Sequence, residues 1–539
     1  MASVQEYGAV FTKPWMVELM LDLCGYTPDR DLSRCVAVEP SCGDGAFLLP
    51  MVERLSAACH SRGLDIIEAA DAIRAFDLQI QHVETCRTAV ERWLVEEGWP
   101  RKTAVTLAER WVTCDDYLLR GDNPEEADFV IGNPPYIRAE AIPRDLRTQY
   151  VETCSTMTEG SDIYVGFFEV GLRSLKPTGV LCFICADRWM RNGYGKKLRR
   201  LVVEEFDVRA VYEMHGVDAF AQEVSAYPAV TIIGRGPQEK VRYATACPTF
   251  DAIAASRLEA WSNNGGQPTH DPDFEATVLS DWFHTDAHWP TGTPESLSLL
   301  RELEARLPLL EETGAKVGIG IATGADSVFV TPDAGAVESD RLLPLVKTGD
   351  ITCGRVEGHG TWLVNPWAAD GSLVSLREYP MLRSYFEAHE PQLSKRHVAK
   401  KSDGGHWYRT IDKVMPGLRE RPKLLFQDMK MTIEPVLDQG SYYPHHNLYW
   451  VTSDEWDLQV LGGLLLSRVA EFFVSSYAVR MRGGTLRFQA QYLRLIRVPR
   501  PEDISHDLKV RLGQAFMDRD VAAATAASLE AYGINSVPN

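Results

Sequence analysis

Short apolar runs alternate with longer amphipathic stretches between about residues 30 and 235. The runs have the length of buried strands, and the stretches between them show the spacing of apolar positions that is typical of helices. The expected strands are residues 35–39, 73–77, 128–131, 179–184 and 229–233, and the expected helices are residues 46–62, 79–96 and 163–176. This alternation predicts a doubly wound α/β domain with a mostly parallel sheet.

The alternation is lost beyond about residue 260. Residues 262–268, Ser-Asn-Asn-Gly-Gly-Gln-Pro, have the composition of a linker. A chain of 539 residues is also longer than one core of ordinary size requires. We therefore expect two domains, residues 1–260 and residues 270–539, the second with a mixed α+β fold.

The composition, 45% hydrophobic and 24% charged residues, excludes a largely disordered protein. No run approaches the roughly 20 apolar residues that a membrane span needs. The first residues, Met-Ala-Ser-Val-Gln-Glu, lack the basic start and apolar core of a signal peptide. We expect a soluble, cytoplasmic protein without a membrane partner.

The net charge of −19 is unevenly distributed along the chain. Residues 381–500 contain 18 Lys and Arg against 12 Asp and Glu, a local charge of +6 that leaves −25 for the remainder. Nucleic-acid binding depends on such local clustering rather than on net charge. The contrast favours an acidic body with a mildly basic C-terminal portion, although ordinary variation in surface charge gives the same pattern.

A glycine-rich turn follows the first expected strand. The strand ends at Glu39, and Pro40-Ser41-Cys42-Gly43-Asp44-Gly45 leads into the next helix. Glycine lets a backbone approach a ligand closely, and a carboxylate at a strand end can hold an amine or a hydroxyl group. The turn lacks the Gly-x-Gly-x-x-Gly pattern of nicotinamide sites. A tight turn without a ligand would have the same sequence.

Acidic residues also follow the next expected elements. Asp77 ends the second strand, where an acid meets the ribose diol in doubly wound nucleoside sites. Asp115 and Asp116 precede Tyr-Leu-Leu and can offer a carboxylate to an adenine amino group. Each acid alone also suits a helix cap or a solvated turn, but their order along the chain favours a nucleoside site.

The expected strand 128–131 runs into Asn133-Pro134-Pro135-Tyr136. The prolines fix φ and remove two backbone donors, so the loop presents carbonyl oxygens beside the Asn side chain. Acceptors of this kind suit an exocyclic NH₂ group, and they favour the tetrahedral geometry of a methyl-transfer transition state. Tyr136 can stack on the base. A rigid proline turn without a ligand is the structural alternative.

Together these motifs resemble those of amino-methyltransferases that use S-adenosylmethionine, in the DNA adenine-N6 class in which the cofactor motifs come first. Over nearly its whole length the chain is similar to the Eco57I-type and TaqI-type modification methylases. The resemblance implies a Rossmann-like methyltransferase domain, a C-terminal target-recognition domain, S-adenosyl-L-methionine as cofactor and double-stranded DNA as partner.

The resemblance also implies roles for individual residues. Residues 8–14 match the first cofactor motif, Glu39–Gly45 the glycine-rich motif, and Asp77 the ribose-binding acid. Asp116 is preferred over Asp115 because the family places its acid just before an aromatic residue and a leucine. The implied cofactor-binding residues are Phe11, Thr12, Glu39, Pro40, Ser41, Cys42, Gly43, Gly45, Phe47, Asp77 and Asp116.

Residues 218–224 resemble the segment whose aromatic residue sandwiches a flipped base, which implies that role for Phe220. Without the resemblance, Phe220 is an ordinary core residue. Residues 317–330 and 343–351 resemble the opening of the recognition region, whereas Ala75 departs from the glycine that is usual in the family. The implied catalytic residues are Asn133, Pro134, Pro135, Tyr136 and Phe220.

Two C-terminal segments are candidates for DNA contact. Residues 394–401 and 406–409 interleave cations with aromatic residues, and residues 480–488 combine arginines with glycines. Lys and Arg there can neutralise phosphates. A solvated face with packed aromatic side chains is the alternative.

No metal site is expected. Cys182 and Cys185 lie in an apolar strand without a second Cys pair, which favours buried thiols. His445 and His446 follow two tyrosines and a proline and have no acidic or Cys partner nearby in the sequence, which favours a structural loop.

The sequence therefore predicts a site-specific DNA adenine-N6 methyltransferase, the modification component of a restriction-modification or phage-defence system, with a separate endonuclease or defence subunit as partner. Transfer would be a direct in-line attack without a covalent enzyme intermediate. The alternatives are an RNA base N-methyltransferase, a methyltransferase for protein glutamine, and a catalytically idle DNA-binding subunit of the same fold.

Overall fold

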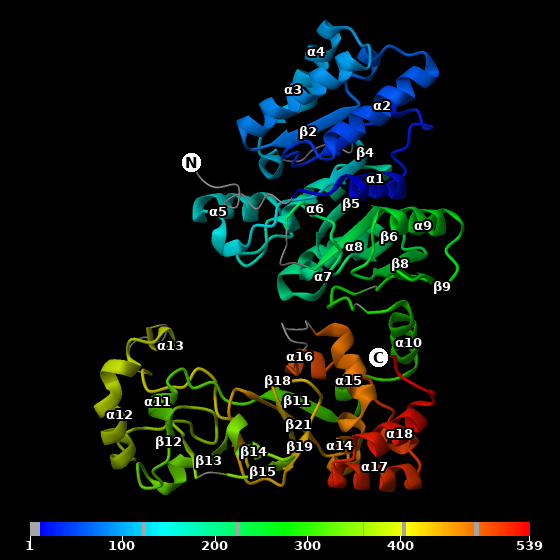
Figure 1. Cartoon of the computed structure of the whole chain (residues 1–539). Coiled ribbons are helices and arrows are strands. Elements are labelled where there is room, and N and C mark those ends of the chain that lie inside the picture. The colour runs from blue at the N-terminus through cyan, green and yellow to red at the C-terminus, as the bar shows by residue number, and fades with distance from the viewer. Residues whose placement is uncertain are drawn as a thin grey trace. The chain divides into compact units, whose positions relative to one another are not determined.

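The computed structural model describes residues 11–120, 126–222, 227–283, 285–290, 292–358, 360–400, 406–478 and 485–538. The chain forms two compact units, Met1–Glu295 and Ser296–Asn539 (Figure 1). Each unit has its own sheets and its own buried core.

The first unit is built on a ten-stranded sheet with the strand order β3-β2-β1-β4-β5-β7-β6-β8-β10-β9. The first five strands in this order are parallel, and β7 lies antiparallel between β5 and β6. The strands are β1 (Ala37–Glu39), β2 (Ile73–Asp77), β3 (Val112–Cys114), β4 (Ala127–Gly132), β5 (Leu175–Ala186), β6 (Phe206–Glu213), β7 (Pro228–Arg235), β8 (Val241–Ala246), β9 (Thr269–His270) and β10 (Phe274–Leu279).

Helices cover both faces of this sheet (Figure 1). The helices of the unit are α1 (Pro14–Cys24), α2 (Leu48–Arg62), α3 (Ile80–Glu96), α4 (Arg101–Trp111), α5 (Arg144–Thr153), α6 (Tyr164–Arg173), α7 (Arg188–Arg191), α8 (Lys196–Glu205) and α9 (Ala252–Asn263). In β5, Cys182 lies in the core formed with α1, α2 and α9. The neighbouring Phe183 packs on Phe168 of α6 with ring centroids 5.2 Å apart. A strand that is buried on both faces has a continuous run of apolar residues, and this run is what predicted β5 from the sequence.

The predicted α/β sheet is confirmed, but the predicted linker is wrong. Ser262 and Asn263 end α9, and Gly265 and Gly266 form a turn with φ of +87° and +65°. The chain then continues into β9 and β10, and β10 pairs antiparallel with β8 in the same sheet. The first compact unit therefore extends to Glu295 rather than to about residue 260.

The second unit is a mixed α+β fold, as expected, with two four-stranded sheets of order β11-β21-β17-β19 and β12-β16-β13-β20. Their strands are β11 (Ala315–Ile319), β12 (Val330–Thr331), β13 (Leu342–Val346), β16 (Trp362–Val364), β17 (Lys423–Gln427), β19 (Val436–Asp438), β20 (Tyr443–Pro444) and β21 (Leu448–Ser453). Two short ribbons pair β14 (Ile351–Thr352) with β15 (Arg355–Val356) and β18 (Met429–Lys430) with β22 (Leu486–Arg487).

The boundary between the units falls in the first turn of α10 (Pro294–Arg306). The further helices of the second unit are α11 (Asp326–Phe329), α12 (Pro380–Leu393), α13 (His397–Lys400), α14 (Leu458–Leu466), α15 (Arg468–Tyr477), α16 (Ala490–Leu493), α17 (His506–Asp518) and α18 (Val521–Tyr532). The β17 and β21 strands separate two cores. Leu424 and Val451 face the core of α14, α15, α17 and α18, whereas Leu425 and Trp450 face the core of α11 and α12.

Within the described part of the chain, no single helix is both long and apolar enough to cross a membrane. The helices α14 and α15 reach that length and composition only together, with a bend of 62° between them. Their apolar residues are buried in the core of the second unit.

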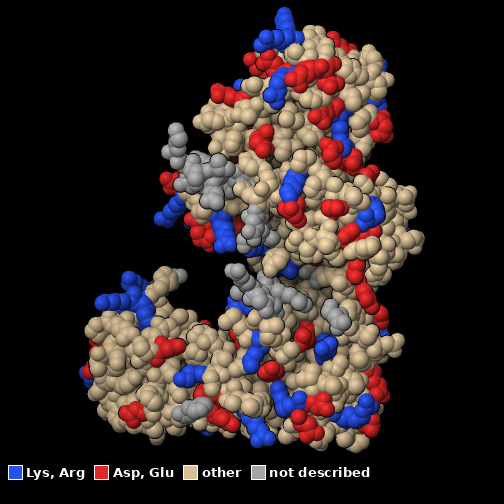
Figure 2. Space-filling model, in the orientation of Figure 1, with Lys and Arg blue, Asp and Glu red and all other residues tan. Residues whose placement is uncertain are grey.

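On one face of the molecule, the charge contrast along the sequence does not separate an acidic from a basic surface. On the face drawn in Figure 2, acidic and basic side chains are interspersed over both units. A local cluster of Lys and Arg is visible at α13, where Lys395 and Lys400 are exposed (Figure 2).

Candidate active site

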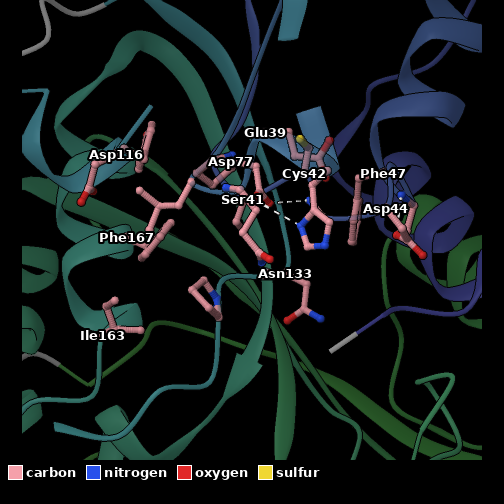
Figure 3. Close-up of a pocket in the computed structure, with 18 of the residues that line it drawn as sticks. Glu39, Ser41, Cys42, Asp44, Phe47, Asp77, Asp116, Asn133, Ile163 and Phe167 are labelled. Atoms are coloured by element: carbon pink, nitrogen blue, oxygen red, sulfur yellow. Dashed lines mark hydrogen bonds and ion pairs between the residues drawn. The ribbon is translucent and has the colours of Figure 1, made fainter. Parts of the chain in front are cut away.

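A pocket lies at the carboxyl ends of β1, β2, β3 and β4, where open α/β sheets bind ligands (Figure 3). The free space in it, including open solvent at the mouth, is about 880 Å³. Loops from four separate strands meet here because parallel strands end at the same edge of a sheet. Of the predicted site residues, the pocket is lined by Phe11, Thr12, Glu39, Pro40, Ser41, Cys42, Gly43, Phe47, Asp77, Asp116, Asn133 and Pro135.

The glycine-rich turn forms one wall of the pocket. Gly43 has a φ of +51°, and its N–H donates to Asp77 Oδ2 at 3.0 Å. A Cβ at Gly43 would lie 3.5 Å from the Phe11 ring, so the turn and that ring pack closely. Gly45, with a φ of +90°, is buried behind the wall, where a Cβ would lie 3.3 Å from Cys86 Sγ. Gly45 therefore shapes the turn without lining the pocket.

Asp77 is fixed by several donors. Besides the Gly43 N–H, its Oδ1 accepts the Gln79 N–H at 2.8 Å and lies 3.3 Å from His82 Nδ1. Gln79 and His82 also line the pocket, but no sequence motif indicated them. The carboxylate thus has a defined orientation at the end of β2.

Glu39 is a buried acid at the end of β1, only 1% exposed. Its Oε2 is buried and makes no hydrogen bond to any described residue. Burial raises the pKa of this carboxyl well above its usual value, and Cys86, Asp44 and Asp77 raise it further. A cationic group in the pocket would satisfy this oxygen and favour the ionised acid.

Asp116 lies at the opposite end of the pocket from Phe47 (Figure 3). It caps the short 3₁₀ helix Tyr117–Leu119: its Oδ1 accepts the Leu118 N–H at 3.0 Å, and its Oδ2 accepts the Tyr150 hydroxyl at 2.8 Å. Asp115 also lines the pocket but is more exposed, and its Oδ2 pairs with Arg120 at 2.6 Å. The two acids therefore differ in how firmly they are held.

Asn133 connects the loop after β4 to two other segments. Its Nδ2 donates to Thr12 Oγ1 at 3.1 Å, and its backbone carbonyl accepts the Ser41 hydroxyl at 3.2 Å. A Cβ at Gly132 would lie 3.4 Å from Pro40, so the ends of β4 and β1 pack tightly. These contacts hold the Asn133 loop against both the glycine-rich turn and the N-terminal segment.

Pro134, Tyr136 and Phe220 lie beside the pocket and do not line it. The Tyr136 hydroxyl donates to the Ile184 carbonyl at 3.4 Å, and burial raises the pKa of Tyr136 well above its usual value. The Tyr136 and Phe220 rings meet edge to face, with centroids 6.3 Å apart and an interplanar angle of 79°. Phe220 pairs with Thr12 in an isolated antiparallel bridge. The structure thus brings Thr12, Asn133, Tyr136 and Phe220 together.

Comparison with known proteins identifies the family. The family model described as Eco57I restriction-modification methylase matches residues 62–220. The chain is 43% identical over 535 residues to the Type II methyltransferase M.PaeR7I of Pseudomonas aeruginosa. This alignment covers 98% of this chain and 92% of M.PaeR7I. The chain is 40% identical over 538 residues to M.XhoI of Xanthomonas vasicola, with 98% of both chains covered. The chain is a Type II DNA methyltransferase of the restriction-modification family.

A solved structure agrees with the fold of this Type II methyltransferase. The Type IIL restriction-modification enzyme MmeI in complex with DNA aligns with a TM-score of 0.55 at 11% identity, covering 97% of this chain and 74% of that chain. The expected Rossmann-like α/β fold is therefore confirmed, together with the family resemblance and S-adenosylmethionine as the methyl donor.

The pocket of the methyltransferase fits this cofactor. The orphaned, buried Glu39 oxygen matches a cationic amine, as on the methionine part. Asp77 at the end of β2 has the position of a ribose-binding acid. Asp116 at the far end has an oxygen pair suited to an adenine amino group. Phe167 and Ile163 add apolar walls at the same end (Figure 3).

The structure also brings in residues that the sequence did not indicate. Tyr150 of α5 reaches Asp116 from 34 residues away, and Tyr117, Ile163 and Phe167 line the same end of the pocket. In the sequence, these side chains look like the apolar and aromatic residues by which any helix packs on its neighbours, so nothing marks them as site residues. Only the packing of α5 and α6 over the sheet edge gives them a place in the site.

The basic segment around α13 is only partly available for a ligand. The Arg396 guanidinium donates to the carbonyls of Thr323, Trp407 and Arg409, so it ties its own segment to two other loops. Lys395, His397 and Lys400 are exposed. Tyr408 is buried, as expected for a packed aromatic residue.

In the second candidate segment, residues 480–484 lie outside the described residues. Arg487 is paired with Asp428, and Phe488 is buried. The interpretation of His445-His446 as a loop without an acidic partner is wrong, because Asp326 Oδ2 lies 2.9 Å from His445 Nε2. That partner is 119 residues away in the sequence.

Proposed function

We propose that this methyltransferase modifies N6 of adenine within a defined sequence of double-stranded DNA, in the cytoplasm, as the modification component that protects DNA from a separate restriction endonuclease. The observation that carries the proposal is the position of Asn133 and Pro135, which line the same pocket as Glu39, Asp77 and Asp116. The Asn-Pro-Pro-Tyr loop therefore borders, through Asn133 and Pro135, the pocket that suits the methyl donor.

The loop is suited to an exocyclic amino group. Bound S-adenosylmethionine supplies an electrophilic methyl group on a sulfonium. The Asn133 side-chain oxygen and the Pro134 carbonyl would accept the two hydrogens of the amine, which directs its nitrogen lone pair toward that methyl group. Pro135 has no N–H to compete for these acceptors. The hydrogen bond from Asn133 Nδ2 to Thr12 sets the orientation of the amide.

A base inside a duplex cannot reach this loop, so we propose that the adenine is flipped out and held between Tyr136 and Phe220. A base stacked on both faces needs parallel rings ~7–8 Å apart. The present rings are 6.3 Å apart and nearly perpendicular. Binding therefore includes rotation of at least one ring, at the cost of the edge-to-face contact.

We assign the second unit, Ser296–Asn539, to target recognition. Its exposed cations at α13, Lys395 and Lys400, are suited to phosphate contact, which would make binding strongly dependent on salt. Its mixed sheets and loops are not required for the cofactor pocket, every lining residue of which belongs to the first unit.

The test is product identification. The purified chain is incubated with labelled S-adenosylmethionine and unmodified genomic DNA, total RNA or protein, and labelled DNA is digested to nucleosides for mass spectrometry. We expect label in DNA alone, as N6-methyladenine at one sequence. N4-methylcytosine, which also arises from an exocyclic amine, would contradict the adenine assignment. Label in RNA or protein, or no label at all, would contradict the DNA-modifying function.

A further inference from the structure

Three metal-ligating side chains meet in the second unit, far from the residues of the cofactor pocket in sequence. They are Asp326 at the start of α11 and His445 and His446, which follow β20. His445 Nε2 lies 2.9 Å from Asp326 Oδ2 and 3.1 Å from His446 Nδ1. One oxygen and two imidazole nitrogens all lie within 4.8 Å of one another.

His445 Nε2 makes two close contacts, with Asp326 and with His446, and a single proton on this nitrogen cannot satisfy both. With neutral imidazoles, a proton on His445 Nε2 can be directed to Asp326 or to His446 Nδ1, but not fully to both. Without that proton, the Nε2 lone pair faces the Asp326 carboxylate. A divalent cation between the three atoms would accept a lone pair from each of them.

The spacing is close to that of a metal site. Zn²⁺ binds His nitrogen and carboxylate oxygen at ~2.0–2.2 Å, so neighbouring ligand atoms in a tetrahedral site are separated by ~3.3 Å. The contacts of 2.9 and 3.1 Å would open by a few tenths of an ångström. The third pair, Asp326 and His446, lies within 4.8 Å and would close to about the same spacing. One nitrogen can move that far by rotation of an imidazole ring.

The surrounding structure holds the three side chains in place. The Thr323 hydroxyl donates to Asp326 Oδ1, which leaves Oδ2 directed at His445. The backbone N–H of His445 donates to the Val346 carbonyl at 3.0 Å, and that of His446 donates to the Ile321 carbonyl at 3.1 Å. The Thr323 bond is of the outer kind that orients a ligating carboxylate, and the two backbone bonds fix the positions from which the imidazoles project.

We propose that Asp326, His445 and His446 form a binding site for a divalent transition-metal ion, with Zn²⁺ as the preferred occupant. Two imidazoles and one carboxylate are the ligand types that Zn²⁺, Co²⁺ and Ni²⁺ share. Asp326 is 48% exposed, so the fourth position is open to water. The ion would tie the start of α11 to the loop after β20, at the edge of the second four-stranded sheet. This inference does not depend on the proposed methylation of adenine.

A second cluster in the first unit provides an internal comparison. Asp187, Glu213 and His215 also present ligand atoms within 4.8 Å of one another. There, however, the Arg191 guanidinium pairs with Asp187 Oδ2. That cation already occupies the position that a metal would need. At the Asp326 cluster, Lys347, which follows Val346, contributes a through-space charge at His445, and the ion pair of Asp326 is with His445.

The experiment uses the full chain, stripped with a chelator and then titrated with Co²⁺ and with Zn²⁺. We expect one ion per chain by elemental analysis, visible Co²⁺ ligand-field bands without a thiolate charge-transfer band, and a higher unfolding temperature with Zn²⁺. Asp326→Asn, which preserves side-chain size, and His446→Asn, which removes the imidazole ring, should each weaken Co²⁺ affinity by at least about tenfold. A cooperative thermal unfolding transition of each metal-free variant establishes that the variant is folded.

His215→Asn and His406→Asn are the matched controls, since one alters the second cluster and the other removes an exposed histidine of the second unit. Both should bind Co²⁺ like the parent chain. No stoichiometric binding would overturn the proposal. Loss of binding in His215→Asn, unchanged binding in both cluster variants, or a thiolate band would equally overturn it, because each assigns the ion to another site.

Discussion

The side-chain amide of Asn133 donates from Nδ2 to Thr12 Oγ1 at 3.1 Å, across 121 residues of sequence. Thr12 is 5% exposed and lies between the Asn133 loop and Phe220, with which it forms a backbone bridge. One hydrogen bond therefore connects the residue that we expect to bind the reacting amine with the segment that carries the base-stacking ring.

Replacing Thr12 by Val should slow methyl transfer by about tenfold, because the variant keeps the shape of the side chain and loses one buried hydrogen bond. Thr12→Ser retains the hydroxyl and should stay within about twofold of the parent chain. Single-turnover rates at saturating cofactor measure the effect. Equal rates for Val and Ser variants would show that the Asn133 amide does not need Thr12 for its orientation.

Asp116 and Asp115 offer a matched pair for the adenine end of the pocket. Asp116→Asn should weaken cofactor binding by about tenfold, because the acid lines the pocket and is held in place by Leu118 and Tyr150. Asp115→Asn should have an effect below about twofold, because Asp115 is exposed and paired with Arg120. Calorimetric titration with S-adenosylmethionine measures the cofactor affinity of both variants. A larger loss of affinity in Asp115→Asn than in Asp116→Asn would assign the contact to Asp115.

Tyr150 should act through Asp116 as a positioning residue. Tyr150→Phe is expected to weaken cofactor binding by a few-fold and to leave the single-turnover rate at saturation unchanged. In a double-mutant cycle, Tyr150→Phe should add less to Asp116→Asn than to the parent chain, since the amide weakens the contact that Tyr150→Phe removes. Fully additive losses in calorimetry would mean that Tyr150 contacts the ligand independently.

Glu39→Gln should affect the free and the bound protein in opposite directions. Burial raises the pKa of Glu39, so the ionised acid costs folding free energy as pH rises above the value of ~4.3 in the unfolded chain. The amide avoids this cost, and the cofactor-free variant should unfold at a higher temperature at pH 7. Its affinity for S-adenosylmethionine should fall by about tenfold or more, because the cationic amine loses its counter-charge. A variant with unchanged affinity would contradict the assigned role of Glu39.

The ion pair of His215 and Asp187 should make stability depend on pH. Burial lowers the pKa of His215, but the hydrogen bond to Asp187 and the charge of Glu213 outweigh it and raise the pKa above its usual value. The contribution of the charged imidazole is therefore complete below pH ~6.5 and is lost as pH rises through the raised pKa. His215→Gln should lower the unfolding temperature most at pH 6 and progressively less toward pH 9, and a constant difference would contradict this.

The sequence allowed prediction of those parts of the fold and site that are encoded locally. The buried run of β5, the acid that ends β2 and the Asn-Pro-Pro-Tyr loop each have a signal within a few residues. Tyr150, His82 and the partnership of Asp326 with His445 have none, because they depend on how separate segments pack. The linker was misplaced for a related reason: two glycines form the same turn inside a domain as between domains.

The most direct test of the role of Asn133 combines two measurements on Asn133→Ala. We expect the variant to bind S-adenosylmethionine within about threefold of the parent chain, because one neutral contact near the pocket is worth little binding free energy. Its single-turnover methylation of cognate DNA should be lower by at least about a hundredfold, the usual cost of losing a transition-state acceptor or donor. Methylation at near-parental rates, with cofactor binding intact, would contradict the assignment of the Asn133 loop as the catalytic element.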